Sequence, residues 1–429
     1  MANWLKDLET AGFVCCILQN TASEDTKAFL ADTLALSRDA IFESKYVDLR
    51  FFSEVLKERT ETAHETMAES SSDPFGAGTF NFLSKRDRLC CVPYDSFNEV
   101  LSFLGEAASD PDVISIRQTL YRTGRESAVT DLLCRAAQNG KEVIVLMELR
   151  ARYDEERNLE NTKKLMASGA KVIFGRAGLK THCKLLLVER KEQGGIRRYA
   201  HISTGNYNEF TAKTYTDVGL FTASTGICDD VLSLFEYAAG YGNKPDLYSL
   251  TASPFGLKEE FLRLIERERF NAGNGKAAEI TAKINSLCDR DIIDALLSAA
   301  ASGVKVTLIV RGICCFRPSR PGLNDNLTVL SVVGKQLEHS RIFRFRNGGN
   351  TEYYCSSADW MPRNFEGRIE VLFPIWDKSA QRKLESVLNR LSEGSIDTGQ
   401  LTPTGEYIPT SGKTGSAQED LTGLIGGMD

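Results

Sequence analysis

Two of the chain's four histidines lie in matching contexts far apart in the sequence, and this feature constrains the fold more than any other. The first context runs from GLKTHCKLLLVER (178–190) through Gly194-Gly195 to STGNYN (203–208). The second runs from LEHSRIFRF (337–345) through Gly348-Gly349 to SSADWM (356–361). Each predicts a strand that begins at a histidine, a Gly-Gly hairpin, and a return strand that ends in an Asn- or Asp-aromatic pair. The chain is therefore predicted to carry one histidine-centred hairpin twice.

The duplication extends beyond the hairpins. Asp217 lies eleven residues after Asn206, and Glu370 lies eleven after Asp359. Upstream, LLCRAAQNGKEVIVLMEL (132–149) and LLSAAASGVKVTLIV (296–310) both read as a helix that ends at Gly, followed by a β-branched strand. Matched markers are 153 (359 − 206) to 163 (303 − 140) residues apart, too far for a solenoid of short repeats. The predicted fold class is α/β, with two similar lobes that face each other and contribute one histidine each to a shared cleft.

Composition divides the chain into four parts. Residues 1–80 are predicted to be a short helical part that ends in a Ser- and Gly-rich linker at 65–80. The first lobe is placed at 81–250 and the second at 251–393, beginning with a charged helix at 257–273. Residues 394–429 are rich in Gly, Ser and Thr with little to bury, which predicts a mobile tail.

The gross composition is that of an ordinary globular protein. At 429 residues the chain can form two or three domains, each with its own core. It has no apolar run of the roughly 18 residues that a membrane helix requires, and its N-terminus is acidic where a signal peptide is basic. We therefore expect a cytoplasmic protein without a transmembrane segment. The 11 cysteines, which lack CxxC spacing, are interpreted as reduced thiols.

Positive charge is concentrated around both histidine segments, although the net charge is −6. Residues 176–213 hold eight Lys or Arg against three acids, and residues 305–346 hold eight against two. One such segment alone is most simply a solvated strand face. Two of them that coincide with the duplicated histidines favour a polyanionic ligand at the cleft.

A histidine with a cation and a carboxylate in a basic pocket is suited to attack phosphorus, because the imidazole can form a phosphoramidate while cations neutralise the transferred group. Paired histidines allow one to be the nucleophile and the other a general acid or base. The two sets predicted within the lobes are His182, Lys184 and Asp217, and His339, Arg341 and Glu370. The remaining histidines are interpreted differently: His201 as a structural hydrogen-bonding group, and His64 as exposed.

This pattern resembles the phospholipase D superfamily, whose mark is HxKxxxxD followed by a Gly/Ser-x-Asn element, occurring twice. Two departures stand out. Glu189 occupies the aspartate position of the first copy, and HSR (339–341) replaces HxK in the second. Diester hydrolysis normally uses lysine in both copies, so the departures count against it.

Seven segments, in order along the chain, carry a closer resemblance. They are DPDVISIRQTLYRTG (110–124), ELRARYDEERN (148–158), GLKTHCK (178–184), YAHISTGNYNEFTAKTYTD (199–217), VRGICCFRP (310–318), LEHSR (337–341) and SADWMPRNFEGRIEV (357–371). Over nearly the whole chain they resemble polyphosphate kinase of the phospholipase-D-like type. Members usually carry a separate N-terminal domain before the second domain, and Met1 falls within that second domain by this resemblance. The chain thus resembles a member that lacks the N-terminal domain.

The resemblance implies a role for each motif residue. His182 would be the phosphorylated histidine and His339 its partner at the nucleotide phosphates. Tyr215 and Arg311 would contact ATP, with Arg341 and Arg368 as further candidates for the phosphates. Arg122 and Arg152 match magnesium-site positions, and we interpret them as clamps on the phosphates around the ion, because a guanidinium donates hydrogen bonds and has no lone pair for a cation.

The implied activity is reversible transfer of the terminal phosphoryl group of ATP to polyphosphate, with Mg²⁺. The expected partners are polyphosphate and ATP or ADP, with no nucleic acid, and the family implies a possible homo-oligomer. Two alternatives stay open: a non-catalytic polyphosphate-binding protein and a phospholipase-D-like phosphodiesterase.

Overall fold

The computed structural model describes residues 16–19, 22–34, 37, 41–44, 75–76, 78–121, 127–148, 155–316, 326–410 and 415–425. The chain separates into two units, residues 1–68 and 69–429. In the first unit, β1 (Cys16–Gln19) and β2 (Ile41–Ser44) pair in parallel, and α2 (Glu24–Leu34) connects them in the sequence. The part expected to be helical therefore also contains strands. His64 lies outside the described residues.

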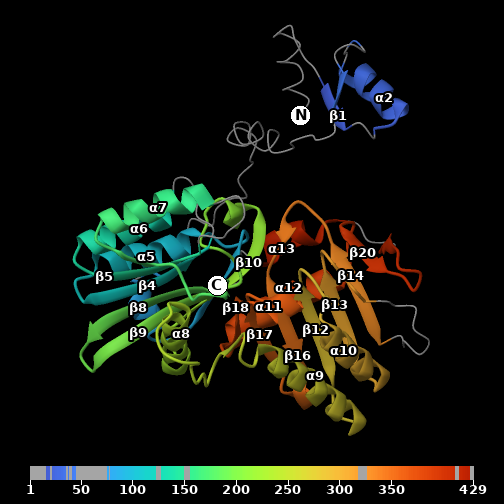
Figure 1. The fold of residues 1–429 in the computed structure, drawn as a ribbon. Coiled ribbons are helices and arrows are strands. Elements are labelled where there is room, and N and C mark those ends of the chain that lie inside the picture. Colours follow the sequence, from blue (N-terminus) through green and yellow to red (C-terminus); the bar gives the residue numbers. More distant parts are fainter. Residues whose placement is uncertain are drawn as a thin grey trace. The chain divides into compact units, whose positions relative to one another are not determined.

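The first lobe of the second unit is built on a mixed sheet with the strand order β15-β10-β9-β8-β4-β5-β6, in which β3 also pairs with β10. Helices α5, α6 and α7 lie along one face of this sheet and α8 along the other (Figure 1). The elements are α4 (Thr79–Leu83), β3 (Arg88–Val92), α5 (Asn98–Ser109), β4 (Val113–Leu120), α6 (Ala128–Gln138), β5 (Glu142–Met147), α7 (Glu155–Ala167), β6 (Lys171–Ile173), β7 (Lys180–Thr181), β8 (Lys184–Glu192), β9 (Gly195–Ser203), η2 (Thr211–Lys213), β10 (Tyr215–Thr222) and α8 (Thr225–Ala238).

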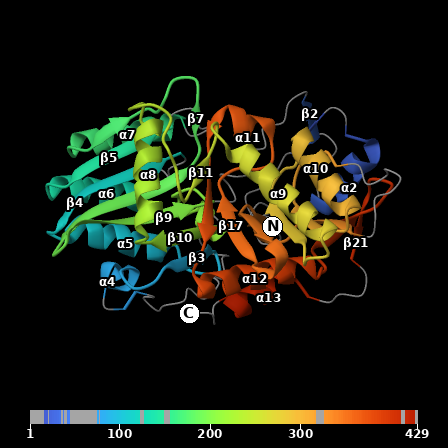
Figure 2. The same ribbon diagram turned by 90° about the horizontal axis from the view of Figure 1, so that it is seen from below.

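The second lobe is built on a sheet with the order β11-β19-β17-β16-β12-β13-β14-β20-β21. Helices α9 and α10 lie side by side on one face, and α12 lies on the other next to α13 (Figure 2). The elements are β11 (Thr251–Ala252), α9 (Leu257–Gly273), β12 (Glu279–Ile284), α10 (Arg290–Ala301), β13 (Lys305–Val310), β14 (Leu327–Val332), β15 (Leu337–Glu338), β16 (Arg341–Phe345), η3 (Asn347–Gly349), β17 (Glu352–Ser356), α11 (Pro362–Glu366), β18 (Arg368–Ile369), β19 (Val371–Ile375), α12 (Lys378–Ser392), β20 (Thr398–Leu401), β21 (Tyr407–Pro409) and α13 (Ala417–Ile425).

The duplicated hairpins form as the sequence predicts. In the first lobe β8 and β9 pair antiparallel from Lys184↔Ser203 to Glu192↔Gly195. In the second lobe β16 and β17 pair from Arg341 to Phe345, and η3 makes the turn. The buried apolar run from Leu185 to Val188 packs on both faces of its sheet, which fixes β8 in the centre of the lobe. The charged helix predicted at 257–273 is α9, with the same bounds.

The second lobe contributes two short strands that pair with strands of the first lobe. Strand β15 comes from the second lobe in sequence but pairs in parallel with β10 of the first. Strand β18 pairs in parallel with β7, which directly precedes His182. A buried ion pair, Lys383 Nζ to Asp95 Oδ2 at 2.6 Å, joins α12 to the loop after β3. Each histidine segment is thus joined by backbone pairing to a strand of the opposite lobe.

Residues 394–429, predicted to be a mobile tail, instead contribute two strands and a helix in their described part. Strand β20 extends the second sheet by pairing with β14. Helix α13 buries the apolar side chains Ala417, Leu421 and Ile425. The prediction fails because a few apolar residues at helical spacing are enough to dock a short amphipathic helix, although the overall composition is polar. No helix of the described part is long and apolar enough to span a bilayer.

Candidate active site

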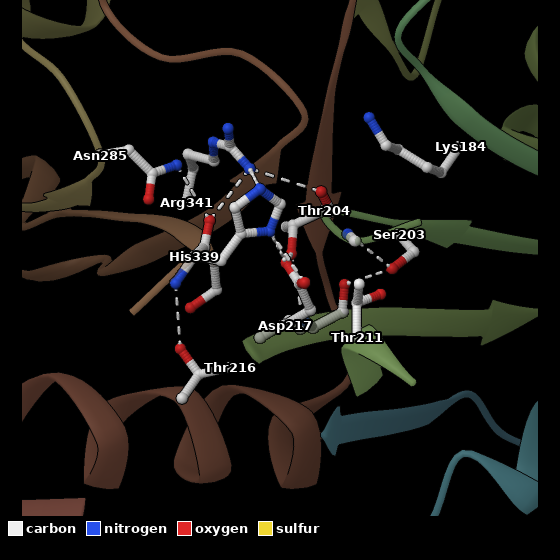
Figure 3. A network of polar contacts seen from close by, with 12 residues as sticks. Lys184, Ser203, Thr204, Thr211, Thr216, Asp217, Asn285, His339 and Arg341 are labelled. Atoms are coloured by element: carbon white, nitrogen blue, oxygen red, sulfur yellow. Dashed lines mark hydrogen bonds and ion pairs between the residues drawn. The ribbon is translucent and has the colours of Figure 1, made fainter. Parts of the chain in front are cut away.

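The two histidines meet carboxylates from the opposite lobe. His182 Nδ1 lies 2.8 Å from Glu370 Oε2, and His339 Nδ1 lies 2.8 Å from Asp217 Oδ2 and 2.9 Å from Oδ1. Figure 3 shows Asp217 beneath the His339 ring. The grouping predicted from the sequence, which paired each histidine with the carboxylate of its own lobe, is therefore wrong. The exchange follows from the crossed strands, since β18 brings Glu370 beside His182 and β10 brings Asp217 beside β15.

Glu370 is fully buried and fully hydrogen-bonded. Its Oε2 also accepts from Ser357 Oγ at 2.6 Å, and its Oε1 accepts from Asn364 Nδ2 at 2.6 Å. Burial alone would raise the pKa of Glu370, but His182 and the nearby Lys184 outweigh it and lower that pKa. Burial also lowers the pKa of His182, to about 3, against the opposing pull of Glu370. The pair is thus a carboxylate with a neutral imidazole, whose Nδ1 proton points at Glu370.

Asp217 is held in a similar way. Its Oδ1 accepts from Thr204 Oγ1 at 2.6 Å. Burial would raise its pKa, but His339, Thr204 and Arg341 together lower it. The pKa of His339 is lowered, first by burial and further by Arg341. This imidazole is therefore also neutral, and its Nδ1–H donates to Asp217.

The two imidazoles differ at their outer nitrogens. Arg341 Nη1 lies 3.3 Å from His339 Nε2, and Arg341 also donates to the His339 carbonyl at 2.9 Å (Figure 3). His182 Nε2 has no hydrogen-bond donor among the described residues. A lone pair engaged by a guanidinium is a poor nucleophile, whereas the lone pair of His182 Nε2 is available.

The cations beside the two histidines also differ. Arg341 is paired with Asp359, with Nη2 3.1 Å from Oδ2 and Nε 3.2 Å from Oδ1. Burial raises the pKa of Asp359, but Arg341 outweighs burial and lowers that pKa to about 2. Asn206 occupies the matching place in the first lobe and carries no charge. Lys184 is 2 % exposed and its Nζ donates to the His182 carbonyl. Burial lowers its pKa to about 7, and Arg341 contributes in the same direction.

Tyr121 is a site residue that the sequence did not single out. Its ring packs edge-on against the His182 imidazole at 5.1 Å between centroids, and Lys184 Nζ lies 5.5 Å from the ring centre. The ring therefore restrains the imidazole and contacts the lysine through a cation–π interaction. Its position directly after β4, within a motif already quoted, was the available signal.

The predicted nucleotide residues surround His339. The Tyr215 ring lies 5.3 Å from the His339 ring, and Arg311 Nε donates to Asn285 Oδ1 at 2.8 Å and to the Glu338 carbonyl at 2.6 Å. Those contacts use only Nε, and the outer guanidinium nitrogens of Arg311 have no hydrogen-bond partner among the described residues. Arg368, on the other side, lies 3.7 Å from Glu370 Oε1. Arg122 and Arg152 lie outside the described residues.

Two residues of the histidine hairpins are structural. Glu189 accepts from Ser115 at 2.7 Å and is paired with Arg117 and Arg198, away from the histidines. His201 Nδ1 lies 3.0 Å from the Tyr207 hydroxyl, as expected for a structural group.

Both lobes match models of a known protein family. Residues 78–244 match the model of the polyphosphate kinase C-terminal domain 1, and residues 250–419 match that of the C-terminal domain 2. The chain is 45% identical over 328 residues to a polyphosphate kinase of Pseudomonas aeruginosa (76% of this chain, 48% of that one). It is 41% identical over 388 residues to one of Halalkalibacterium halodurans (88% and 55%). The chain thus spans about half the length of these curated relatives.

Solved structures give the same result. A polyphosphate kinase from Porphyromonas gingivalis superposes with a TM-score of 0.81 at 32% identity, covering 96% of this chain and 64% of that one. A phosphatidylserine synthase of Haemophilus influenzae superposes with a TM-score of 0.50 at 12% identity, covering 80% and 92%, a likeness of fold alone. The predicted fold class of two tandem phospholipase-D-like α/β lobes is confirmed.

Proposed function

Since the chain belongs to the polyphosphate kinase family, we propose that it reversibly transfers the terminal phosphoryl group of ATP to polyphosphate through a phosphohistidine at His182. The observation that carries this proposal is the unequal pair of histidines: both are oriented by a carboxylate of the other lobe, but only His182 presents an Nε2 without a donor in the described part. That arrangement suits one nucleophile and one partner.

In the first step the lone pair of His182 Nε2 attacks the γ-phosphorus of ATP, and the bond from that phosphorus to the bridging oxygen breaks. ADP leaves with the electron pair on that oxygen. Glu370 keeps the Nδ1 proton in place and stabilises the positive charge that the ring gains. In the second step a terminal oxygen of polyphosphate attacks the same phosphorus, and the P–N bond breaks to return the lone pair to Nε2. The polymer is then one phosphate longer.

His339 acts on the other side of the phosphoryl group, at the oxygen that leaves with ADP. Asp217 holds the His339 ring through Nδ1, and Arg341 Nη1 lies within hydrogen-bond distance of its Nε2. Lys184 and Arg341 supply positive charge where the three equatorial oxygens of the transferred group gather negative charge. Arg311 and Tyr215 border the nucleotide side, and Arg368 the opposite side.

Magnesium is part of the proposed reaction, with Arg122 and Arg152 as clamps around it. The three carboxylates beside the histidines do not fit a protein-ligated ion, because Glu370 and Asp217 are each bonded to a histidine and Asp359 to Arg341. Mg²⁺ requires oxygen ligands in octahedral geometry and is commonly held through substrate phosphates. Oxygens of the nucleotide and of polyphosphate would therefore coordinate the ion, rather than these side chains.

The proposed partners are polyphosphate and ATP or ADP, in the cytoplasm, with a homo-oligomer as the proposed assembly. One feature supports polyphosphate over a diester substrate, because the second lobe has Arg341 where a lysine would complete the phosphodiesterase pattern.

The test is incubation with γ-³²P-ATP and Mg²⁺, scored for acid-labile, base-stable label on the protein and for long-chain polyphosphate, beside His182→Ala and His201→Ala. Label and polymer that are lost in His182→Ala, and retained in His201→Ala where that variant folds, would support the proposal. Label without polymer would restrict it to the first step. Absence of label from the folded wild-type protein would favour a polyphosphate-binding protein, and hydrolysis of a model diester would favour a phosphodiesterase.

A further inference from the structure

A glutamine on the C-terminal helix reaches the segment that carries His339. Gln418 lies in the first turn of α13 and is only 3 % exposed. Its Oε1 accepts from the Gln336 backbone N–H at 2.8 Å, and its Nε2 donates to the Gln336 carbonyl at 2.9 Å and to Glu338 Oε1 at 2.6 Å. The amide orientation is fixed by chemistry, because a carboxylate can only accept. The Gln418 amide thus bonds both the N–H and the carbonyl of Gln336, three residues before His339, as the backbone of a neighbouring strand would.

Packing around this amide is tight. A β-carbon placed on Gly334 would lie 2.5 Å from Gln418 Oε1, below any contact that a real β-carbon makes. Glycine at 334 is therefore what admits the glutamine side chain to the segment that precedes β15.

Glu338 connects Gln418 to the catalytic elements. Its Oε2 accepts from Thr216 Oγ1 at 2.9 Å and lies 3.0 Å from Lys283 Nζ, which in turn donates to Ser340 Oγ at 2.8 Å. Lys283 and Glu338 are 1 % and 4 % exposed. A buried ion pair is tolerated only when its remaining hydrogen-bonding capacity is satisfied, and Gln418 supplies the donor for Oε1. The network contacts both neighbours of His339 in the sequence and the neighbour of Asp217.

No such network is found at the matching position among the described residues of the first lobe. In the second lobe, Lys283 pairs with Ile342, the residue that follows Arg341. In the first lobe, Leu185 follows Lys184, and Thr119 takes the place of Lys283. The Thr119 hydroxyl accepts from the Leu185 N–H at 2.9 Å. Thr181 stands before His182 where Glu338 stands before His339. The ion pair and its glutamine therefore belong to the second histidine alone.

We infer that Gln418 is a positioning residue for His339, so that helix α13 is part of the catalytic apparatus. The inference rests on the proposed function. Glu338 and Ser340 fix the backbone on both sides of His339, whose own N–H bonds the Thr216 carbonyl at 3.3 Å and hydroxyl at 3.2 Å. Without the amide, Glu338 Oε1 loses a buried donor, and the Glu338 carboxylate turns toward Lys283 or draws in water. Either movement shifts His339 relative to Asp217.

The consequence is a defect in turnover rather than in nucleotide binding. Gln418 has no direct contact with Tyr215 or Arg311 in the described structure. Glu338 holds Arg311 through its main-chain carbonyl, and that main chain stays paired with β10 when the carboxylate moves, so the KM for ATP is expected to change less than about twofold. A misplaced His339 slows departure of ADP, and kcat is expected to fall about tenfold or more. Phosphorylation of His182 in a single turnover should slow by the same factor.

The experiment compares Gln418→Leu and Gln418→Asn with Glu419→Ala, a matched control at an exposed position of the same helix. Gln418→Asn keeps the polarity and withdraws the amide from Glu338, so it serves where Gln418→Leu does not fold. The measurements are kcat and KM for ATP, the single-turnover rate, the thermal midpoint, and the imidazole ¹⁵N resonances, which four histidines make assignable.

Support would be a loss of kcat in the Gln418 variants at unchanged KM, with a shifted His339 resonance, unchanged His182 and His201 resonances, and a wild-type-like control. Turnover within twofold of wild type in folded Gln418 variants would overturn the inference, and so would a His339 resonance that does not move. If the wild-type protein shows no kinase activity, the proposed function fails. The resonances still decide whether Gln418 positions His339.

Discussion

Gly205→Ala is expected to disable His339 from a position that touches neither histidine. A β-carbon at residue 205 would lie 2.3 Å from both Cγ and Oδ2 of Asp217, whereas real contacts stay above 3.0 Å and ordinary ones begin at 3.4 Å. The carboxylate must therefore retreat by 0.7 Å (3.0 − 2.3) to 1.1 Å (3.4 − 2.3).

The retreat is large compared with the hydrogen bond it disturbs. His339 Nδ1 lies 2.8 Å from Asp217 Oδ2. A displacement of this size directly away from the ring stretches that contact beyond the roughly 3.2 Å limit of a good hydrogen bond. Misplacement of a catalytic group by about 1 Å costs about 10²-fold in rate, equivalent to about 2.7 kcal/mol in activation free energy.

The assay is the initial rate of polyphosphate synthesis from ATP, with the His339 ¹⁵N resonance as a readout that does not need turnover. Gly194→Ala is the matched control, because it lies in the hairpin turn of the same lobe and a β-carbon there meets nothing within 4 Å. We expect the control to keep the wild-type rate. A Gly205→Ala protein with a rate near that of the control and an unshifted His339 resonance would refute the argument.

Three further changes test the charges at the site. Glu370→Gln should remove the orientation of the His182 ring and lower the labelling rate by roughly 10² to 10⁴, measured in a single turnover; a rate near wild type would contradict the crossed pairing. Lys184, with a pKa of about 7, loses its charge as the pH rises through that value, while His182, with a pKa of about 3, stays neutral. The kcat/KM should therefore fall above about pH 7, and titration of His182 should cause no decrease on the acid side down to about pH 4. Lys184→Arg should abolish the fall above about pH 7. A fall that persists in this variant would show that another group causes it. Asp359→Asn leaves Arg341 buried without its carboxylate and should lower the free energy of unfolding by about 3 kcal/mol, measured by urea denaturation; a loss below about 1 kcal/mol would mean that other acceptors suffice.

Local patterns in the sequence predicted the elements of the fold. Helix α9 has the predicted bounds because its apolar spacing and flanking glycines are properties of a contiguous segment. The hairpins form for the same reason, since a turn and two strands with buried apolar side chains lie within a few residues of each other. Where burial depended on docking, the prediction was wrong: α13 reads as a polar tail until its three buried apolar residues meet the second lobe.

The duplicated segments were enough to predict two lobes, a central histidine in each, and a cation and a carboxylate near each histidine. Which carboxylate meets which histidine depends on the packing of the two lobes. His182 and Glu370 are 188 residues apart, and they meet because two-residue strands cross between the lobes. Such a contact leaves no periodicity in either segment. The same holds for Gln418, whose function depends on a buried carboxylate 80 residues away, so a glutamine in a polar helix becomes informative only when its neighbours in space are known.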